Sequence, residues 1–112
     1  MNVKTSFLKN KIHENSPNKN IVPVTTTINS DNNLFIGGCS LEDLVRKYDS
    51  PLYVLDEITL RNSCRAYKKA LEKYYPGPSL PIYASKANSS IFMSNLIASE
   101  GFGLDAVSEG EL

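Results

Sequence analysis

The sequence predicts an α/β fold in which short parallel strands alternate with helices. From residue 52 onward, apolar runs of strand length at 52–55, 80–84 and 104–107 alternate with longer segments of helical periodicity. Such alternation favours parallel pairing through right-handed crossovers. It is unfinished at residue 112, whereas a closed barrel of this class takes about 250 residues. We therefore expect this chain to be the N-terminal piece of a longer protein.

Composition argues against several function classes. The 112 residues carry 12 basic and 12 acidic side chains, so no basic face for a nucleic acid is expected. No apolar run reaches the roughly 18 residues that a membrane span requires, and the N-terminus lacks the apolar segment of a secretory signal. The two cysteines, Cys39 and Cys64, have no metal-ligand spacing. We expect a cytoplasmic protein with reduced thiols and neither a membrane partner nor a metal.

Residues 1–33 differ from the rest because they are rich in asparagine and poor in aromatic side chains. Such a segment buries too little apolar surface to offset the entropy of ordering, so we expect it to be largely disordered. A β-branched run predicts one strand at 21–28, and a second follows at 34–36. Residues 31–33 between them have the composition of a turn.

A helix and a strand come next. Gly37-Gly38 breaks the chain, and Ser40 followed by acidic residues is typical of a helix N-terminus. Apolar residues at helical spacing extend this helix to Tyr48. Ser50-Pro51 stops it, because a residue before proline avoids the α region. The compact apolar run at 52–55 then predicts a strand.

A long amphipathic helix is predicted from about residue 57 to 74. Its apolar stripe recurs at helical spacing and consists of Leu60, Cys64, Tyr67, Leu71 and Tyr74. In this position Cys64 is more typical of a small core residue than of a reactive thiol. The run Pro76-Gly77-Pro78 ends the helix.

The strand at 80–84 leads to the most informative residue, Lys86. Side chains alternate along a strand, which places Ile82, Ala84 and Lys86 on one face. The small Ala84 leaves room there for a flat group. A lysine near apolar surroundings favours its neutral amine, a nucleophile that forms a Schiff base with an aldehyde. The alternative is a lysine that ends a strand and points into solvent.

The last elements repeat the pattern of helix and strand. Asn88 or Ser89 is expected to cap a third helix, which Gly101 ends. A strand follows at 104–107. The spacing of Ser108 and Glu111 is that of a capping box, and it predicts the start of a fourth helix.

Several blocks of this sequence, in this order and with these gaps, resemble the diaminopimelate decarboxylase family. They are Gly37–Leu41, Ser50–Glu57, Tyr83–Asn88 and Gly103–Leu112. The likeness is to bacterial, cyanobacterial-style members and runs from about Leu34 to the end. The family is one of the fold-type III pyridoxal-phosphate enzymes, alongside ornithine decarboxylase and alanine racemase. The run after Lys86 departs from the alanine racemase pattern, which counts against a racemase.

The resemblance implies a fold and a set of roles. Residues 34–112 would start a pyridoxal-phosphate-binding (β/α)8 barrel domain, left incomplete, and the short N-terminal strands would belong to a separate β domain. Lys86 matches the lysine that holds pyridoxal 5'-phosphate, with Ala84 beside the cofactor. Asp105 and Glu111 match acidic positions that receive the lysine once the substrate displaces it. From the residues alone, Glu111 could equally be a helix cap and Asp105 a structural carboxylate.

The implied activity is the decarboxylation of meso-2,6-diaminopimelate to L-lysine and CO2, a step of lysine biosynthesis, by a homodimer of the full-length chain. The alternatives are another decarboxylase of this fold, acting on ornithine, arginine or carboxynorspermidine, or an inactive truncated fragment. The family's phosphate site and its acid for the pyridine nitrogen do not occur in these residues. We therefore expect the 112-residue piece alone to be inactive.

Overall fold

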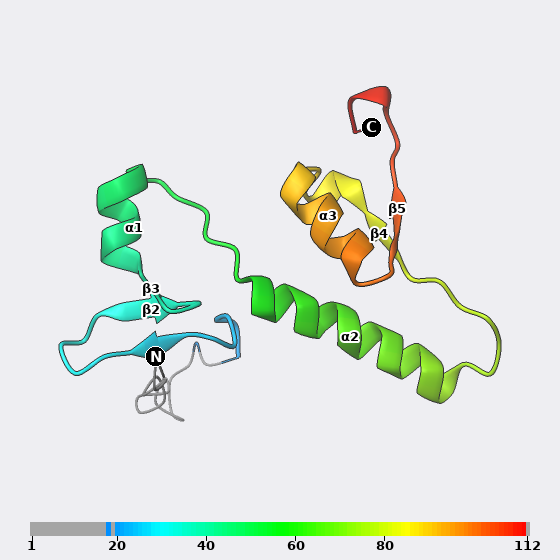
Figure 1. Cartoon of the computed structure of the whole chain (residues 1–112), viewed down its shortest axis with the longest axis horizontal. Coiled ribbons are helices and arrows are strands. Elements are labelled where there is room, and N and C mark those ends of the chain that lie inside the picture. Colours follow the sequence, from blue (N-terminus) through cyan, green and yellow to red (C-terminus); the bar gives the residue numbers. More distant parts are fainter. Residues whose placement is uncertain (1–17, 19, 112) are drawn as a thin grey trace, which may run out of the picture. The chain divides into compact units, whose positions relative to one another are not determined.

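The computed structural model describes residues 18 and 20–111 (Figure 1). Residues 1–17 and 19, on which much of the predicted disorder falls, lie outside the described residues. The chain divides into two compact units: the N-terminal unit ends at Thr59, and the C-terminal unit begins at Leu60. The domain boundary predicted at residue 33 concerns the longer protein and stays a prediction.

An antiparallel sheet of short strands opens the N-terminal unit. Its strands are β1 (Thr27–Ile28), β2 (Leu34–Ile36) and β3 (Cys39–Ser40), in the order β1-β2-β3. The Asn29 side chain closes the turn between β1 and β2 by accepting the N–H groups of Asp31 at 3.0 Å and Asn33 at 2.9 Å. This is the turn predicted from the composition of residues 31–33.

The strand predicted at 21–28 is confirmed only at Thr27–Ile28. Just upstream, the N–H and the hydroxyl of Thr26 both donate to the carbonyl of Pro23, at 3.0 and 2.6 Å, and form a turn. Proline lacks the N–H that a strand ladder uses, so the chain turns here instead of pairing. The predicted break at Gly37-Gly38 is the turn between β2 and β3, with φ values of +59° and +79° that glycine adopts without strain.

Helix α1 (Leu41–Tyr48) begins where the sequence predicts. The Ser40 hydroxyl accepts the N–H of Asp43 at 3.4 Å, as expected of an N-cap. The strand predicted at 52–55 is wrong for this structure, because these residues pair with no strand in the described part of the chain. A lone extended segment has no ladder to hold it and no second sheet face to bury it. Leu52, Tyr53 and Leu55 of this segment therefore stay exposed, up to 99% for Tyr53.

Helix α2 (Glu57–Tyr74) has the predicted bounds. A strand–helix–strand arrangement follows, composed of β4 (Ile82–Ala84), α3 (Ile91–Ser99) and β5 (Gly103–Asp105) (Figure 1). The two strands pair in parallel, with Ile82 opposite Gly103 and Ala84 opposite Asp105. The fold is thus mixed α/β, and the predicted parallel pairing is confirmed for these two strands.

The apolar core of the C-terminal unit lies between α2 and α3. Its buried members are Cys64, Met93, Leu96 and Ile97, and Leu60, Tyr83 and Phe102 pack against them. Cys64 is therefore the core residue that its place on the stripe predicts, and burial raises the pKa of its thiol. The far end of the stripe is not covered, since Tyr67 is 68% and Tyr74 73% exposed. Helix α3, with nine residues, is half as long as α2, with 18.

The cap of α3 differs from the prediction. Its N-cap is Ser90, whose hydroxyl accepts the N–H of Met93 at 3.3 Å, rather than Asn88 or Ser89. Asn88 instead accepts the N–H of Ser90 at 3.0 Å through its side-chain oxygen. The predicted end is confirmed: Gly101 has φ +80°, and its N–H donates to the carbonyl of Ala98 at 2.9 Å.

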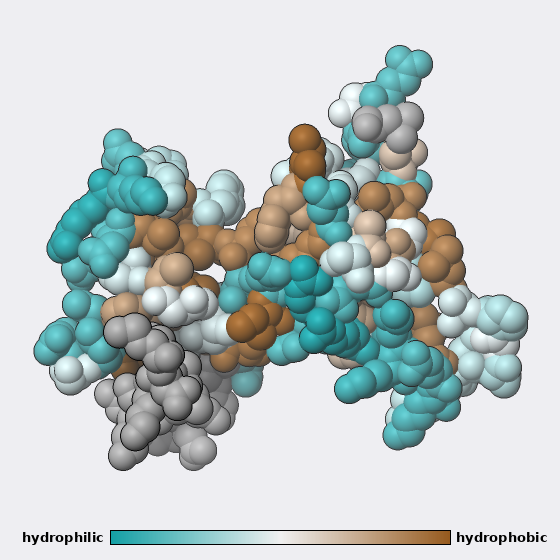
Figure 2. All heavy atoms as spheres, viewed as in Figure 1, coloured by the Kyte–Doolittle hydropathy of each residue, from teal (hydrophilic) through white to brown (hydrophobic). Residues whose placement is uncertain are grey.

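Both units leave large apolar side chains at their surfaces (Figure 2). In the N-terminal unit these include Tyr48, Tyr53, Leu55 and Ile58, and in the C-terminal unit Leu80, Ile82, Ile91 and Val107. Within residues 20–111, no helix combines the length and the hydrophobicity that crossing a membrane requires.

Candidate active site

Lys86 lies in a turn just beyond β4. The strand ends at Ala84, and Ser85–Ala87 form the 3-10 turn η1. The predicted sharing of one strand face by Ile82, Ala84 and Lys86 is therefore wrong, because the alternation stops where the backbone turns at Ser85. The Lys86 side chain is exposed, whereas Ser85 before it is buried. The turn thus presents an accessible amine directly after a strand.

Two hydrogen bonds, one local and one long-range, fix the turn that carries Lys86. The Tyr83 hydroxyl donates to the backbone carbonyl of Asn88 at 3.3 Å and so bridges the base of the turn. The Ser85 hydroxyl donates to Oε2 of Glu111 at 3.0 Å, across 26 residues of sequence. The backbone on both sides of Lys86 is therefore tied to its surroundings, while the lysine side chain itself remains exposed.

Asp105 lies at the same edge of the sheet as this turn. It is the last residue of β5 and stands opposite Ala84, the last residue of β4. Since the carboxyl ends of parallel strands meet at one edge, the carboxylate and the turn with Lys86 are neighbours there. The Asp105 side chain is exposed. Among the described residues, Lys86 forms no ion pair with Asp105 or Glu111.

Glu111 is half-buried at the end of the short turn η2 (Glu109–Glu111), where the sequence predicts a fourth helix. Its Oε2 accepts the backbone N–H of Val107 at 2.7 Å in addition to the hydroxyl of Ser85. A capping box would direct this carboxylate to the N–H of Ser108, so the bond forms one residue earlier than predicted. Glu111 does cap the backbone, and it also reaches the turn that carries Lys86.

Sequence reasoning missed the part played by Ser85. A serine inside a strand-like run has no local signal for a partner 26 residues away. The available hint was its place next to Lys86, combined with a carboxylate shortly after the following strand. The structure places Lys86, Asp105 and Glu111 at one edge of the sheet and adds Ser85 to them.

These residues suit a cofactor that carries an aldehyde. Covalent attachment of an aldehyde requires an accessible primary amine, which Lys86 supplies. Carboxylates at the same edge, from Asp105 and Glu111, can accept the ammonium form of a lysine. Ala84, half-buried at the strand end before Lys86, has a small side chain. The donor set therefore fits a pyridoxal cofactor held through its aldehyde.

An ion-pair cluster stands at the other end of these strands. The Glu100 carboxylate, just before β5, binds Arg61 at 2.7 Å and Arg65 at 2.9 Å. Hydrogen bonds from Arg65 and Arg61 lower the pKa of Glu100 from 4.5 to about 2. Lys68 donates to the Glu100 carbonyl at 3.1 Å. This cluster joins α2 to the end of α3, so its role is to hold the unit together.

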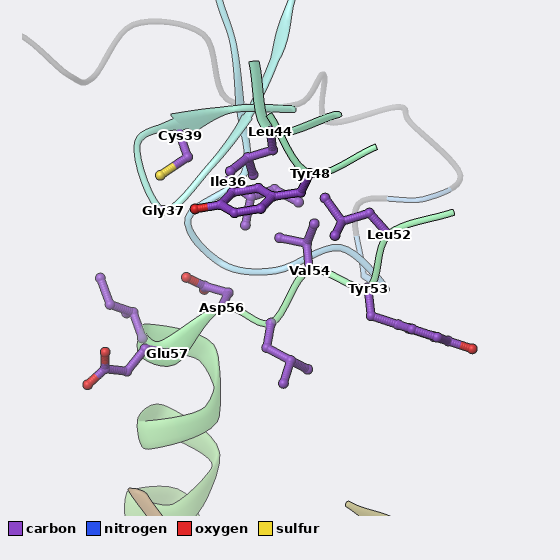
Figure 3. A pocket seen from close by; sticks show the side chains of 12 residues that line it. Ile36, Gly37, Cys39, Leu44, Tyr48, Leu52, Tyr53, Val54, Asp56 and Glu57 are labelled. Atoms are coloured by element: carbon purple, nitrogen blue, oxygen red, sulfur yellow. The ribbon is translucent and has the colours of Figure 1, made fainter. Parts of the chain in front are cut away.

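The N-terminal unit holds a separate pocket of about 600 Å³ (Figure 3). Its lining is mainly apolar and comes from β2, α1 and the extended segment before α2, including Ile36, Leu44, Tyr48, Leu52 and Val54. Asp56, which also lines it, accepts the N–H of Thr59 at 3.0 Å and caps α2. The lining holds no lysine, and it includes none of the residues around Lys86. This pocket is therefore not the candidate active site.

The sequence of this chain is similar to a known family of proteins. Residues 57–112 match the family model described as "Pyridoxal-dependent decarboxylase, pyridoxal binding domain". The chain is 50% identical over 97 residues to the diaminopimelate decarboxylase of Synechocystis sp., a match that covers 87% of this chain and 21% of that protein. Identity to the enzyme of the same name from Methanothermobacter thermautotrophicus is 36% over 85 residues, covering 76% of this chain and 20% of that one.

A third relative has the same name. It is the diaminopimelate decarboxylase of Bacillus methanolicus, 40% identical over 88 residues, with 79% of this chain and 20% of the relative covered. The chain thus spans about a fifth of the length of the curated relatives that it matches. The part of the chain that the family model matches includes Lys86, Asp105 and Glu111.

Proposed function

The chain belongs to the pyridoxal-dependent decarboxylase family, and from this premise we propose that it is the N-terminal part of a diaminopimelate decarboxylase. The longer protein would convert meso-2,6-diaminopimelate to L-lysine and CO2. The observation that carries the proposal is the placement of Lys86, exposed directly after a parallel strand inside the segment matched as a pyridoxal-binding domain. Relatives at 36–50% identity that bear this enzyme's name support the choice of substrate.

The proposed roles follow from the chemistry of each side chain. The Lys86 amine holds the cofactor covalently and is released when the substrate amine takes its place. Pyridoxal 5'-phosphate, when bound, supplies the aldehyde for this exchange and a ring that stabilises the electron pair left by the departing CO2. Ala84 leaves space beside the strand for the ring. A proton then replaces the lost carboxylate on the substrate carbon.

Asp105 and Glu111 are proposed to receive the released ammonium of Lys86. Their position at the carboxyl edge of β4 and β5 supports this role, since catalytic groups of parallel α/β folds gather at that edge. Within the described residues, the hydrogen bonds to Glu111 go to Oε2, which leaves Oε1 available to a cation. A charge-assisted bond to an ammonium is the stronger kind of hydrogen bond and suits a temporary holding place.

The wider architecture belongs to the same proposal. We propose that β4 and β5 are neighbouring strands of a (β/α)8 barrel, and that residues 52–55 become a strand of it when the rest of the chain is present. The short strands β1 and β2 would then belong to a β domain. The exposed side chains of Leu52, Tyr53 and Leu55 support this, because a barrel strand is covered on both faces. A homodimer of the full-length protein is part of the proposal.

Chemical trapping tests the role of Lys86. The full-length protein is loaded with pyridoxal 5'-phosphate, reduced with borohydride, and digested to locate the label. We expect the label on Lys86, its loss in Lys86→Ala, and its retention in Lys69→Ala, a control on the exposed side of α2. A Lys86→Ala protein that still carries one label per chain would overturn the assignment.

Product analysis then tests the substrate. The loaded protein is given meso-diaminopimelate, ornithine or arginine, and CO2 and the remaining amino acid are measured. We expect CO2 and L-lysine from diaminopimelate only. Release of CO2 from ornithine or arginine instead would keep the cofactor chemistry and replace the proposed substrate.

A further inference from the structure

We propose that Ser85 is a positioning residue that anchors the Glu111 carboxylate beside the turn carrying Lys86. The inference rests on the proposed function of Lys86 and deepens it. Its starting point is a buried hydroxyl: Ser85 is 4% exposed, and its Oγ donates to Oε2 of Glu111 at 3.0 Å. A buried hydroxyl without a partner is costly, so this bond fixes the geometry of both groups.

The bond joins the two loops that follow the parallel strands. Ser85 is the first residue after β4, and Glu111 closes the short turn that follows β5. The N–H of Val107, also after β5, donates to the same oxygen at 2.7 Å. One carboxylate oxygen therefore connects both loops, and Lys86 is the residue next to the connection.

This arrangement determines what Glu111 can do for the lysine. Ser85 and Val107 are neutral donors, so they orient the carboxylate without cancelling its charge. With Oε2 held by both, the side chain cannot rotate freely, and Oε1 keeps a fixed position. The ammonium of Lys86, once released from the cofactor, then finds Oε1 of Glu111 already in place. An acceptor held in position stabilises a charge more than an acceptor that must first be ordered.

The test uses the full-length, cofactor-loaded protein with three variants. Ser85→Ala removes the donor, Ser85→Thr keeps a hydroxyl, and Glu111→Gln keeps an acceptor while removing the charge. The first readout is hydrogen–deuterium exchange of the peptide that covers residues 105–111. The second is the separate measurement of kcat and KM for the substrate.

For Ser85→Ala we expect exchange of this peptide to become about tenfold faster, as loss of one hydrogen bond to a charged group predicts. We expect kcat to fall about tenfold with little change in KM, because Ser85 orients Glu111 and touches no substrate. Ser85→Thr should restore most of both values. Glu111→Gln should keep the slow exchange and still lose kcat.

Two outcomes would overturn the inference. One is unchanged exchange and unchanged kcat in Ser85→Ala. The other is a rise in KM as large as the fall in kcat, which would place Ser85 in substrate binding. Trapping with borohydride separates this result from failure of the proposed function. If the label stays on Lys86 in Ser85→Ala, the proposed function holds even when the positioning role fails. A wild-type protein without label would contradict both the proposed function and the positioning role.

Discussion

The two units of the chain are stabilised in different ways. All the buried apolar residues in the described part of the chain, Cys64, Met93, Leu96 and Ile97, belong to the C-terminal unit. The buried residues described in the N-terminal unit are polar: Thr26 and Asp56, each 7% exposed. The N-terminal unit is therefore held mainly by hydrogen bonds, and the C-terminal unit by apolar burial together with the ion pairs of Glu100. The candidate active site lies in the C-terminal unit.

The two units also differ in the apolar surface around their hydrogen bonds. In the N-terminal unit Thr59 links two segments, because its N–H donates to Asp56 and its hydroxyl accepts the N–H of Val24 at 2.9 Å. Around this polar junction, Leu52 and Tyr53 line a pocket and remain 38% and 99% exposed. We expect the additional chain of a protein as long as the relatives to cover them. The C-terminal unit has a core of its own.

The largest expected effect is in the core of the C-terminal unit. Leu96→Ala removes a side chain that is 3% exposed, and we expect a loss of about 2–5 kcal/mol in the free energy of unfolding. Urea denaturation followed by circular dichroism measures it. The matched control is Ile91→Ala on the same helix, 81% exposed, which should cost far less. Equal losses at the two positions would contradict the assignment of the core.

A second effect concerns the ion-pair cluster and its pH dependence. The folded pKa of Glu100, about 2, lies below its ordinary value of 4.5. Its contribution to stability is therefore complete above about pH 4.5 and is lost as the pH falls toward about 2. We expect Glu100→Gln to lower the urea midpoint at neutral pH, and the difference from wild type to shrink across this window. A difference that stays constant down to the acid end would show that Glu100 is not held as an anion.

In the N-terminal unit we expect the N-cap of α2 to contribute more to the free energy of unfolding than any apolar contact. Asp56→Ala removes the acceptor for the N–H of Thr59, with an expected cost of about 1 kcal/mol. Asp56→Asn keeps an acceptor and should cost only a few tenths. The check is to measure the free energy of unfolding of both variants. An Asp56→Asn protein as unstable as Asp56→Ala would mean that the charge, and not the hydrogen bond, stabilises the start of α2.

The smallest effect is expected at the exposed pairs of α1. Arg46 contacts Glu42 at 3.3 Å and Asp43 at 3.2 Å, with the arginine side chain 73% exposed. Glu42→Gln should change the free energy of unfolding by about 0.5 kcal/mol or less, since water and salt screen such pairs. The loss of stability in Glu42→Gln can then be compared directly with the loss in Glu100→Gln. A larger loss at Glu42 than at Glu100 would reverse the contrast between the two units.

The sequence predicted more of the C-terminal unit than of the N-terminal one. The bounds of α2 and the parallel pairing of the strands on either side of α3 are as predicted, because a long amphipathic stripe and alternating elements carry strong signals. The strands themselves are shorter than predicted: β4 begins at Ile82 rather than at residue 80, and β5 ends at Asp105 rather than at residue 107. Residues 21–26 do not form the predicted strand because the chain turns at Pro23. Residues 52–55 do not form the predicted strand because a strand needs a pairing partner, and an apolar run does not specify one.

The sequence alone determined α1, α2 and α3, their caps within a residue or two, and the position of Lys86 at the carboxyl end of a strand. These depend on spacing and capping within a few residues of chain. The tertiary structure alone decided that Ser85 and Val107 share one oxygen of Glu111, and that Glu100 gathers two arginines. Such bonds join residues up to 39 apart, so they depend on which loops and helix ends packing brings together.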